Sequence, residues 1–236
     1  MIFRIQLLET LAACMIFICA CKKNNDETGT KTTISACNTA SLEAVIGTQT
    51  WTTTNLNVDK FRNGDLIPEA KTDAEWLAAA VAGTPAWCNY FNNTDSSAKY
   101  GKLYNWHAVT DSRGLAPAGW HIPSNVDWSV LITYLGGETS AGKKMKTAYG
   151  WEPHYDNITS GNGSNSSCFS GLPGGFRESD GFDDEVNPAV AGFWWSFTAL
   201  KIEDAFYVAL ESYSDNVIHD EEAPKGYGLS VRCLKD

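Results

Sequence analysis

The sequence has no apolar run long enough to cross a membrane. Its N-terminus carries Arg4, and ten apolar or small residues, 11–20, end directly before Cys21. As a helix, ten residues reach about 15 Å, half of a hydrocarbon core of about 30 Å. We therefore expect residues 1–20 to be a secretory signal peptide rather than a spanning helix.

Basic residues are scarce. Lys and Arg number 18 against 28 Asp and Glu, a net charge of −10, and no basic stripe interrupted by aromatic residues runs through the chain. An acidic protein repels phosphate backbones. The composition therefore excludes nucleic acid as a partner.

The common catalytic motifs are missing as well. The chain has no H-E-x-x-H, and no histidine or cysteine lies at ligand spacing from His121. The segment Cys168–Gly171 lacks the leading glycine of a G-x-S-x-G nucleophile elbow. We expect His121 to hydrogen-bond to backbone beside Trp120 and Trp128, with a distant acid as the alternative partner. These gaps favour a protein without catalytic chemistry.

The junction after the apolar run resembles a bacterial lipobox. In Ile18–Cys21 a small residue precedes the cysteine, and the resemblance implies cleavage after residue 20 and acylation of Cys21, which anchors the chain in a membrane. An ordinary signal peptide or an uncleaved anchor is the alternative. Residues 21–40 are polar and predict a flexible tether. Their charges are similar to the surface-export signal of Bacteroidota lipoproteins, which implies an outer-membrane lipoprotein exposed on the cell surface; a solvated linker is the alternative.

Four cysteines follow Cys21: Cys37, Cys88, Cys168 and Cys233. An even number in a chain bound for an oxidising compartment favours two disulfides, and four cysteines allow three connectivities. One bridge with two buried thiols is the alternative. We favour a bridge at Cys233, because it would limit fraying of a terminal strand. Zinc is disfavoured, since no two of the four lie at C-x₂₋₄-C spacing.

Local patterns predict a hairpin and a first helix. Gly47-Thr48 separates two short β-type runs within residues 45–51, which signals a hairpin. Thr72 and Glu75 form a capping box, and the helix that they begin is expected to end at Gly83.

The segment from Ala118 to Leu131 predicts a second helix. Pro123 favours an extended chain before it, and Ser124 with Asp127 forms a shorter-armed capping box. An apolar stripe of this helix, the kind of face that amphipathic helices bury, is made of Val126, Val130 and Tyr134, with Leu131 and Leu135 beside it. One or two further helical turns are expected over 139–146, with Lys143, Lys144 and Lys146 facing water.

The rest of the chain predicts loops and a small sheet. Residues 87–104 are aromatic and polar and are expected to be irregular, and 149–187 form a long functional or self-packed loop. Alternating runs at 193–198, 206–211 and 229–233 predict an antiparallel meander. Residues 41–236 therefore form an α+β domain with two main helices, a small antiparallel sheet and long loops.

Several of these segments together resemble one family. The segments, in colinear order, are WTTTNLNV (51–58), YGKLYNWHAV (100–109), GWHIPSNVDW (119–128), GLPGGFR (171–177), FWWSFT (193–198) and LSVRCLKD (229–236). They resemble the Fibrobacter succinogenes major paralogous domain, which is similar to C-type-lectin-like folds of the sulfatase-modifying type. The resemblance implies a C-type-lectin-like fold, a secreted or cell-surface location and a binding role. Ala116 stands where the family commonly has cysteine and Cys168 where glycine is usual, so Cys168 is a candidate for a relocated disulfide partner.

Aromatic residues in polar loops are the candidates for ligand binding. Sugars stack their C–H faces on exposed rings beside Asn and Asp, and the rings in such loops are Trp87, Tyr90, Phe91, Trp151 and Tyr155. Packing of the long loops by these rings is the alternative. The rings in patterned elements are expected in the core: Trp51, Trp120, Trp128 and Trp195.

An acidic loop suggests calcium as the one cofactor. Its hard oxygen ligands would come from Asp180, Asp183, Asp184 and Glu185. The loop does not fit the EF-hand pattern, and a solvated acidic loop is the alternative.

The sequence as a whole predicts a lipid-anchored, envelope-exposed binding or adhesion module without catalytic activity. Its ligand would be a glycan or a protein, met through residues 149–187. One alternative is an enzyme of the formylglycine-generating type or a metal-assisted hydrolase, and another is a structural envelope protein. Formylglycine-generating activity needs redox-active cysteines close in sequence, whereas the nearest pair after Cys21, Cys37 and Cys88, is 51 residues apart.

Overall fold

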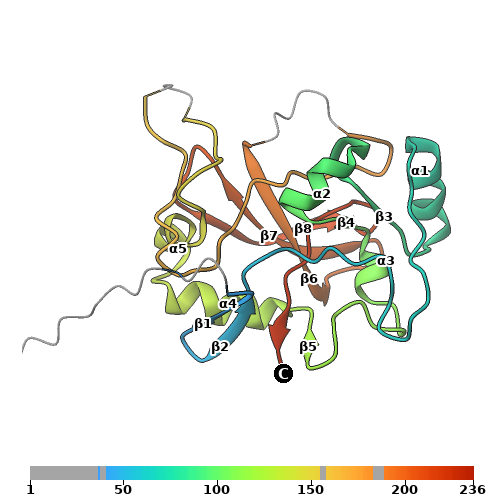
Figure 1. Ribbon diagram of the computed structural model, residues 1–236, viewed down its shortest axis with the longest axis horizontal. Helices are drawn as coiled ribbons and strands as arrows, with labels where there is room; N and C mark the ends of the chain where they lie inside the picture. The colour runs from blue at the N-terminus through green and yellow to red at the C-terminus, as the bar shows by residue number, and fades with distance from the viewer. Residues whose placement is uncertain (1–36, 38–40, 155–157, 183–188) are drawn as a thin grey trace, which may run out of the picture. The chain divides into compact units, whose positions relative to one another are not determined.

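The two ends of the domain meet in one antiparallel sheet. Strands β1 (Glu43–Ile46) and β2 (Gln49–Thr52) form the predicted hairpin. Strand β9 (Leu234–Lys235) pairs with β2 on one side and with β5 (Trp120–His121) on the other (Figure 1). The C-terminus is therefore held by hydrogen bonds between strands.

The computed structural model describes residues 37, 41–154, 158–182 and 189–236. The described residues belong to one compact unit, Ser35–Asp236. They form a mixed α+β domain with several helices and small antiparallel sheets. Among them, no helix combines the length and the apolar character that crossing a bilayer requires.

The longest strands form a three-stranded meander of β6 (Ala191–Ala199), β7 (Asp204–Glu211) and β8 (Val217–Pro224). The first two strands were predicted, but the expectation of a third strand at 229–233 is wrong. Strand β8 takes that place, and its exposed acids, Asp220 to Glu222, hide the apolar alternation that would have signalled a strand. Charged side chains on an edge strand disfavour pairing with another chain.

Both predicted capping boxes are present. Helix α1 (Asp73–Ala82) begins at Thr72 with Glu75 and ends at Gly83 in the left-handed conformation. Helix α4 (Asn125–Tyr134) begins at Ser124 with Asp127. Local hydrogen bonding between side chain and backbone determined these boundaries, and such bonding is readable from sequence.

The buried face of α4 differs from the predicted one. Trp128, Leu131 and Ile132 are buried, whereas Val126 is 71% exposed and Tyr134 is 64% exposed. The helix is apolar on more than one side, so its pattern does not single out a face. Trp128 decides the orientation because its ring packs 4.7 Å from that of Trp51.

Helix α5 (Glu138–Met145) was predicted, but one of its lysines does not face water. The Lys146 side chain is fully buried, and its Nζ donates hydrogen bonds to the carbonyl oxygens of Glu211 and Ser214 at 3.0 and 2.7 Å. Burial lowers the pKa of Lys146. This lysine ties the end of α5 to the connection between β7 and β8.

The segment expected to be irregular contains several short elements. They are β3 (Trp87–Cys88), η1 (Tyr90–Asn92), α2 (Thr94–Tyr100) and β4 (Leu103–Tyr104). Helix α3 (Trp106–Val109) follows this segment. Helix α2 is capped by the Asn93 side chain, which accepts from the amide of Asp95. Because α2 is almost entirely polar, no apolar periodicity in the sequence indicates that a helix begins here.

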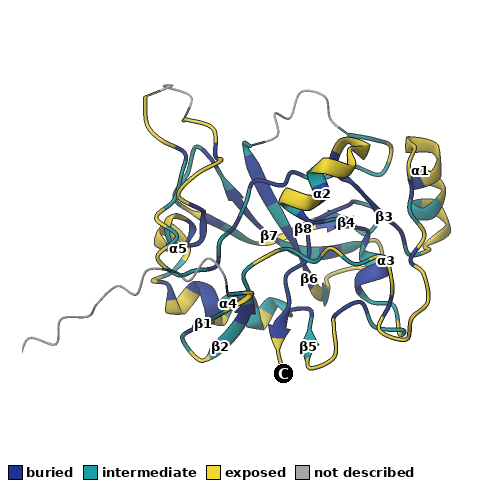
Figure 2. Ribbon diagram, viewed as in Figure 1, coloured by how far each residue is buried: buried dark blue, intermediate teal, exposed yellow. Residues whose placement is uncertain are grey.

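Large aromatic side chains fill the interior. Figure 2 shows that β6 and β7 are buried or half-buried over most of their length, whereas α1 and α2 present much of their surface to solvent. Trp51, Trp128 and Trp195 are fully buried as predicted, and Trp120 is half-buried. The core thus brings together N-terminal, central and C-terminal segments.

Candidate functional site: a polar groove beside the disulfide

A groove with a volume of about 640 Å³ lies where segments distant in sequence meet. Its walls come from the residues around β1, from residues 53–57, from α2 and the following turn, and from residues within 147–172. A cavity of this size suits a small ligand or part of an extended one.

The residues that line the groove are mainly polar and uncharged. Tyr149 is 65% exposed at its rim, and Thr54, Asn57 and Lys99 are exposed along it. Among the described residues that line it, Glu43 is the single carboxylate, and the Nζ atom of Lys235 lies 2.8 Å from its Oε2 atom. The lining therefore offers hydroxyl, amide and aromatic groups rather than a cluster of charges.

A buried arginine, Arg232, forms hydrogen bonds to residues that line the groove. Arg232 Nε donates to Oδ1 of Asn55 at 2.6 Å, and the remaining guanidinium nitrogens donate to the carbonyl oxygens of Thr52, Phe169 and Ser170 at 2.6–3.0 Å. Its guanidinium also lies over the Phe169 ring. Burial lowers the pKa of Arg232 to about 9, so the side chain stays charged at neutral pH.

Asn55 uses both ends of its amide. Its Nδ2 donates to the carbonyl of Tyr100 and to Oγ of Ser230, and its Oδ1 accepts from Trp194 as well as from Arg232. Asn55 therefore joins α2, β6 and the C-terminal segment, and its polar atoms are engaged in the fold.

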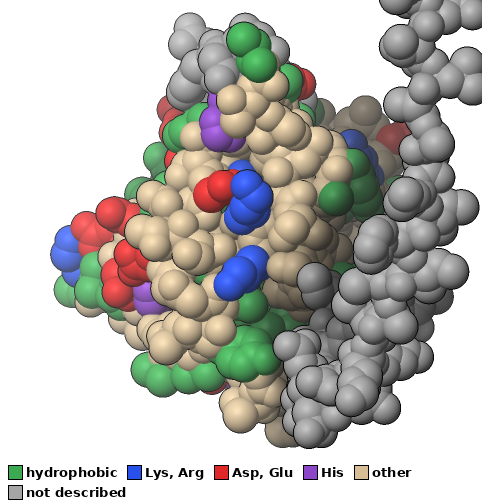
Figure 3. All heavy atoms as spheres, turned by 90° about the vertical axis from the view of Figure 1, so that its left-hand side faces the viewer, with side chains coloured by type: hydrophobic (Ala, Val, Ile, Leu, Met, Phe, Trp, Pro, Cys, Tyr) green, Lys and Arg blue, Asp and Glu red, His purple; other side chains and the backbone are tan. Residues whose placement is uncertain are grey.

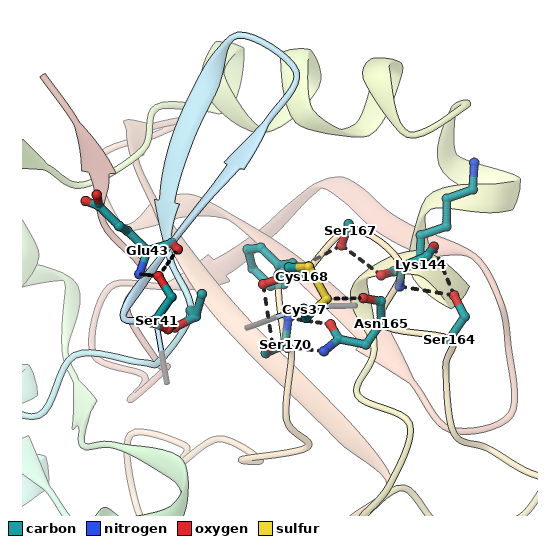
Figure 4. The surroundings of a disulfide bond; sticks show 12 residues. Cys37, Ser41, Glu43, Lys144, Ser164, Asn165, Ser167, Cys168 and Ser170 are labelled. Carbon is teal, nitrogen blue, oxygen red and sulfur yellow. Dashed lines mark hydrogen bonds between the residues drawn. A yellow bond between two sulfur atoms is a disulfide. The ribbon is translucent and has the colours of Figure 1, made fainter. Parts of the chain in front are cut away.

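A disulfide between Cys37 and Cys168 lies at the groove (Figure 4). Cys168 and its neighbours Asn165 and Ser170 all have positive φ angles, of 61°, 49° and 56°. The loop is kept in this shape by two hydrogen bonds between Asn165 and Ser170, and by Ser167, whose hydroxyl donates to the carbonyl of Lys144. Hydrogen bonds of its own side chains therefore hold the loop that lines this wall of the groove.

A second buried arginine organises the opposite part of the domain. Arg177 donates to Oδ1 of Asp73 at 2.6 Å and to Oδ1 of Asn92 at 3.1 Å. Its guanidinium lies over the rings of Trp76 and Phe182. The contacts tie the start of α1 to the chain after residue 171.

The motif segments singled out in the sequence thus lie largely inside the fold, where Asn55, Arg177 and Arg232 join distant segments. A family model described as the Fibrobacter succinogenes major domain matches residues 45–235. The chain belongs to this family. No curated protein and no solved structure matches it.

In this Fibrobacter succinogenes major domain, most of the predicted ligand-binding aromatics are not available to a ligand. Trp87, Tyr90 and Trp151 are buried, so the expectation that they form an exposed surface is wrong. The indole of Trp87 donates to the carbonyl of Ile67, and that of Trp151 donates to Thr147. Packing of the loops, the alternative, accounts for these rings.

Phe91 and Tyr155 complete the predicted set. Phe91 is 38% exposed and stacks on Phe182, with ring centroids 5.0 Å apart, away from the residues that line the groove. Tyr155 lies outside the described residues. The groove aromatic that sequence reasoning missed is Tyr149, which lies between Ala148 and Gly150 without any pattern to mark it.

Most residues of the predicted calcium site, and the predicted lipid anchor, lie outside the described part of the chain. Asp180 is exposed, while Asp183, Asp184 and Glu185 lie outside the described residues, as does Cys21. Within the described ranges, no three His, Cys, Asp or Glu side chains come together in a way that could hold a metal ion.

The described cysteines form one bridge rather than two. Cys88 and Cys233 are buried free thiols, so the expectation of a bridge at Cys233 is wrong and the alternative of one disulfide holds. Burial raises the pKa of each thiol to about 12. Strand pairing of the following residue, Leu234, with Trp51 and His121 secures the chain end instead.

His121 contacts acids rather than backbone. Its Nδ1 lies 2.8 Å from Oδ1 of Asp236, and its Nε2 lies 3.9 Å from Oδ2 of Asp127. The alternative of a distant acid therefore holds. Ser124 donates its hydroxyl hydrogen to Asp127 and caps α4, so it is not paired with the histidine as a nucleophile would be.

Proposed function

We propose that this protein is a lipid-anchored binding module of the cell envelope that holds a glycan in the polar groove. The observation that carries the proposal is the lining itself: an exposed Tyr149 ring stands beside hydroxyl and amide groups, with little net charge. Sugars present apolar C–H faces to aromatic rings and many hydroxyls to polar side chains.

The chemistry of the groove favours binding over catalysis. The bridge Cys37–Cys168 places two cysteines at the groove, as the enzyme alternative requires, but Asn165 and Ser170 surround it rather than an acid or base. The one lining carboxylate, Glu43, is paired with Lys235. The described lining thus provides no pair of groups to divide the roles of general acid and base.

The face that Figure 3 shows is covered largely by uncharged polar side chains and backbone, while acidic side chains gather at its left edge. The signal segment, the lipobox resemblance and the polar tether support a place for the protein on the outer membrane, exposed at the cell surface.

A C-type-lectin-like fold is part of the proposal. It is supported by the pairing of the N-terminal hairpin with the C-terminal strand β9 and by the long connection between α5 and β6. An experimental structure of residues 31–236 tests it: a strand order other than β1-β2-β9-β5 would contradict the proposed fold.

The test of function is a glycan array probed with residues 31–236, a fragment that keeps the whole compact unit. We expect binding to at least one neutral glycan, and at least a tenfold loss of affinity in Tyr149→Ala. Tyr134→Ala is the matched control, since Tyr134 is 64% exposed but lies on α4, away from the groove. Equal losses in both variants, or no binding by the wild type, would contradict the proposal.

A protein ligand is the second candidate, and the exposed face of α4 favours it. Val126, Val130 and Tyr134 form an apolar surface beside the turn at Gly47. Val130→Asp would abolish binding to a protein that uses this face and leave glycan binding unchanged. Pull-down from envelope extracts with wild type and variant separates the two ligands.

A further inference from the structure

We propose that the groove prefers a glycan that carries a carboxylate, and that Lys99 is the residue that sets this preference. The inference rests on the proposed function, since it names the chemical class of the sugar that the same groove binds. Chains of uronic acids, whose sugar rings each bear one carboxylate, are the simplest ligands of this class.

Lys99 is the one cation among the lining residues that the structure describes. It lies in the last turn of α2, and it is exposed. Its Nζ atom lies over the ring of Tyr100, 4.6 Å from the centroid. An aromatic ring attracts a cation without neutralising its charge. The ammonium is therefore held at the groove with its charge available to a ligand.

A second ammonium lies beside the same wall. Lys102 donates from Nζ to Oδ1 of Asn57 at 3.2 Å, and its Nζ atom lies 4.2 Å from the centroid of the Trp87 ring. Asn57 lines the groove, and its Nδ2 donates to the carbonyl of Ser97 on α2. Lys102 therefore adds positive charge next to the wall that carries Lys99.

Neither ammonium forms an ion pair with a carboxylate in the part of the chain that the structure describes. This is unusual for a chain with a net charge of −10. Three other lysines pair with acids at 2.6–3.0 Å: Lys143, Lys201 and Lys235. The partner of Lys235 is Glu43, the lining carboxylate, so Lys99 carries the unpaired charge of the described lining.

A single unpaired ammonium matches a single negative charge on the ligand. A carboxylate accepts charge-assisted hydrogen bonds from an ammonium and further bonds from neighbouring hydroxyls. Thr54, which is exposed in the same lining, offers such a hydroxyl. A phosphate monoester carries about two charges, and the described lining contains no arginine to meet the second. The chemistry of the wall therefore favours a carboxylate.

Lys99 and Tyr149 have separable roles in this arrangement. The Tyr149 ring is exposed at the rim and contacts the C–H face of a sugar whether or not the sugar is charged. Lys99 distinguishes the charged sugar from its neutral form. Loss of the ring should therefore weaken binding of both forms, whereas loss of the ammonium should weaken binding of the acid alone.

The experiment offers residues 31–236 pairs of oligosaccharides that differ in charge but not in backbone: oligogalacturonate and oligoglucuronate, each with its methyl ester. Isothermal titration calorimetry in about 0.05 M NaCl should show about fivefold tighter binding of an acid than of its ester. The ratio should fall toward one in about 0.5 M NaCl, because salt screens a partly exposed ion pair.

Charge variants assign the preference to one residue. Lys99→Gln should lower the affinity for the acid to that for the ester, Lys99→Glu should reverse the order, and Lys99→Arg should keep it. Lys201→Gln is the matched control, since it removes the same charge from the hairpin between β6 and β7, away from the groove lining. It should keep the preference of the wild type.

The outcomes separate this inference from the proposed function. Equal affinities for acid and ester in the wild type, or a preference that persists in Lys99→Gln, would overturn the inference and leave the proposed function standing. Binding of a neutral array glycan without binding of either uronate would do the same. Tighter binding of a sulfated chain than of a carboxylated one would overturn the ligand class. If no glycan of any kind binds, the proposed function fails and the inference fails with it.

Discussion

Arg232 and Asn55, 177 residues apart, are joined by a hydrogen bond of 2.6 Å in the interior of the domain. The buried guanidinium of Arg232 links the C-terminal segment to the residues at and after the end of β2 and to the loop of Cys168. Four oxygen atoms, including the carbonyls of Thr52, Phe169 and Ser170, accept from the same guanidinium. The stability of the groove should therefore depend on this residue.

Arg232→Met should destabilise the domain by about 3–5 kcal/mol, because it leaves buried acceptors without donors. Urea denaturation followed by tryptophan fluorescence measures the change. Lys143→Met is the control: Lys143 forms an exposed ion pair with Asp215, and its loss should cost less than about 1 kcal/mol. Similar midpoints for the two variants would contradict the role given to Arg232.

Removal of the disulfide should lower stability without abolishing folding. The bridge closes a loop across a separation of 131 residues, and the loss of such a constraint on the unfolded chain costs about 2–5 kcal/mol. For a domain of this size each kcal/mol corresponds to about 2–4 °C in the melting temperature. Calorimetry of Cys37→Ser should show one cooperative transition at lower temperature, and an unchanged midpoint would show that the bridge does not form.

The two buried thiols should make the domain sensitive to alkali. Burial raises the pKa of Cys88 and Cys233 from 9.0 to about 12 in the folded state, so folding favours the protonated thiols. Their contribution is fully present below pH 9 and is lost as the pH rises from 9 toward 12, at about 1.4 kcal/mol per pH unit and thiol. Denaturation midpoints measured over this range should fall with pH.

The matched comparison is the double variant Cys88→Ala, Cys233→Ala, which should lose stability less steeply over the same range. A slope equal to that of the wild type would mean that the thiols do not titrate on unfolding. Tyr104, whose pKa burial also raises, remains in both proteins and contributes equally.

Gly47 and Tyr134 should show coupled effects on stability. Gly47 has a φ of +64°, and a Cβ atom there would lie 2.9 Å from the Tyr134 ring. Gly47→Ala should cost about 1–3 kcal/mol through backbone strain and this clash. In a double-mutant cycle, Tyr134→Ala should recover the part due to the clash, and strictly additive effects would contradict the contact.

Local sequence signals predicted the elements whose boundaries depend on neighbouring residues. The boxes at Thr72 and Ser124 and the left-handed Gly83 satisfy hydrogen bonds within a few positions, so they can be read from the chain. The stripe on α4 could not be assigned in the same way. Which of several apolar faces is buried depends on Trp51, 77 residues before Trp128.

The sequence predicted one of the segments that line the candidate site but not the others. Residues 149–187 were expected to meet the ligand, and Tyr149, Asn165 and Ser170 line the groove. The opposite wall, with Thr54, Asn57 and Lys99, comes from segments that carry no chemical motif. Loop aromatics such as Trp87 and Trp151 were misjudged because a polar neighbourhood in sequence does not imply exposure in space.

The sequence by itself determined the starts of α1 and α4, the hairpin, the first two meander strands, the membership of the family and the shortage of catalytic motifs, because these depend on local bonding and residue type. Tertiary structure alone decided that Lys146, Arg177 and Arg232 lie inside, that Cys37 pairs with Cys168, and that a groove opens beside them. A buried charge is stable only when partners distant in the chain satisfy it, and such partners meet only once the chain has folded.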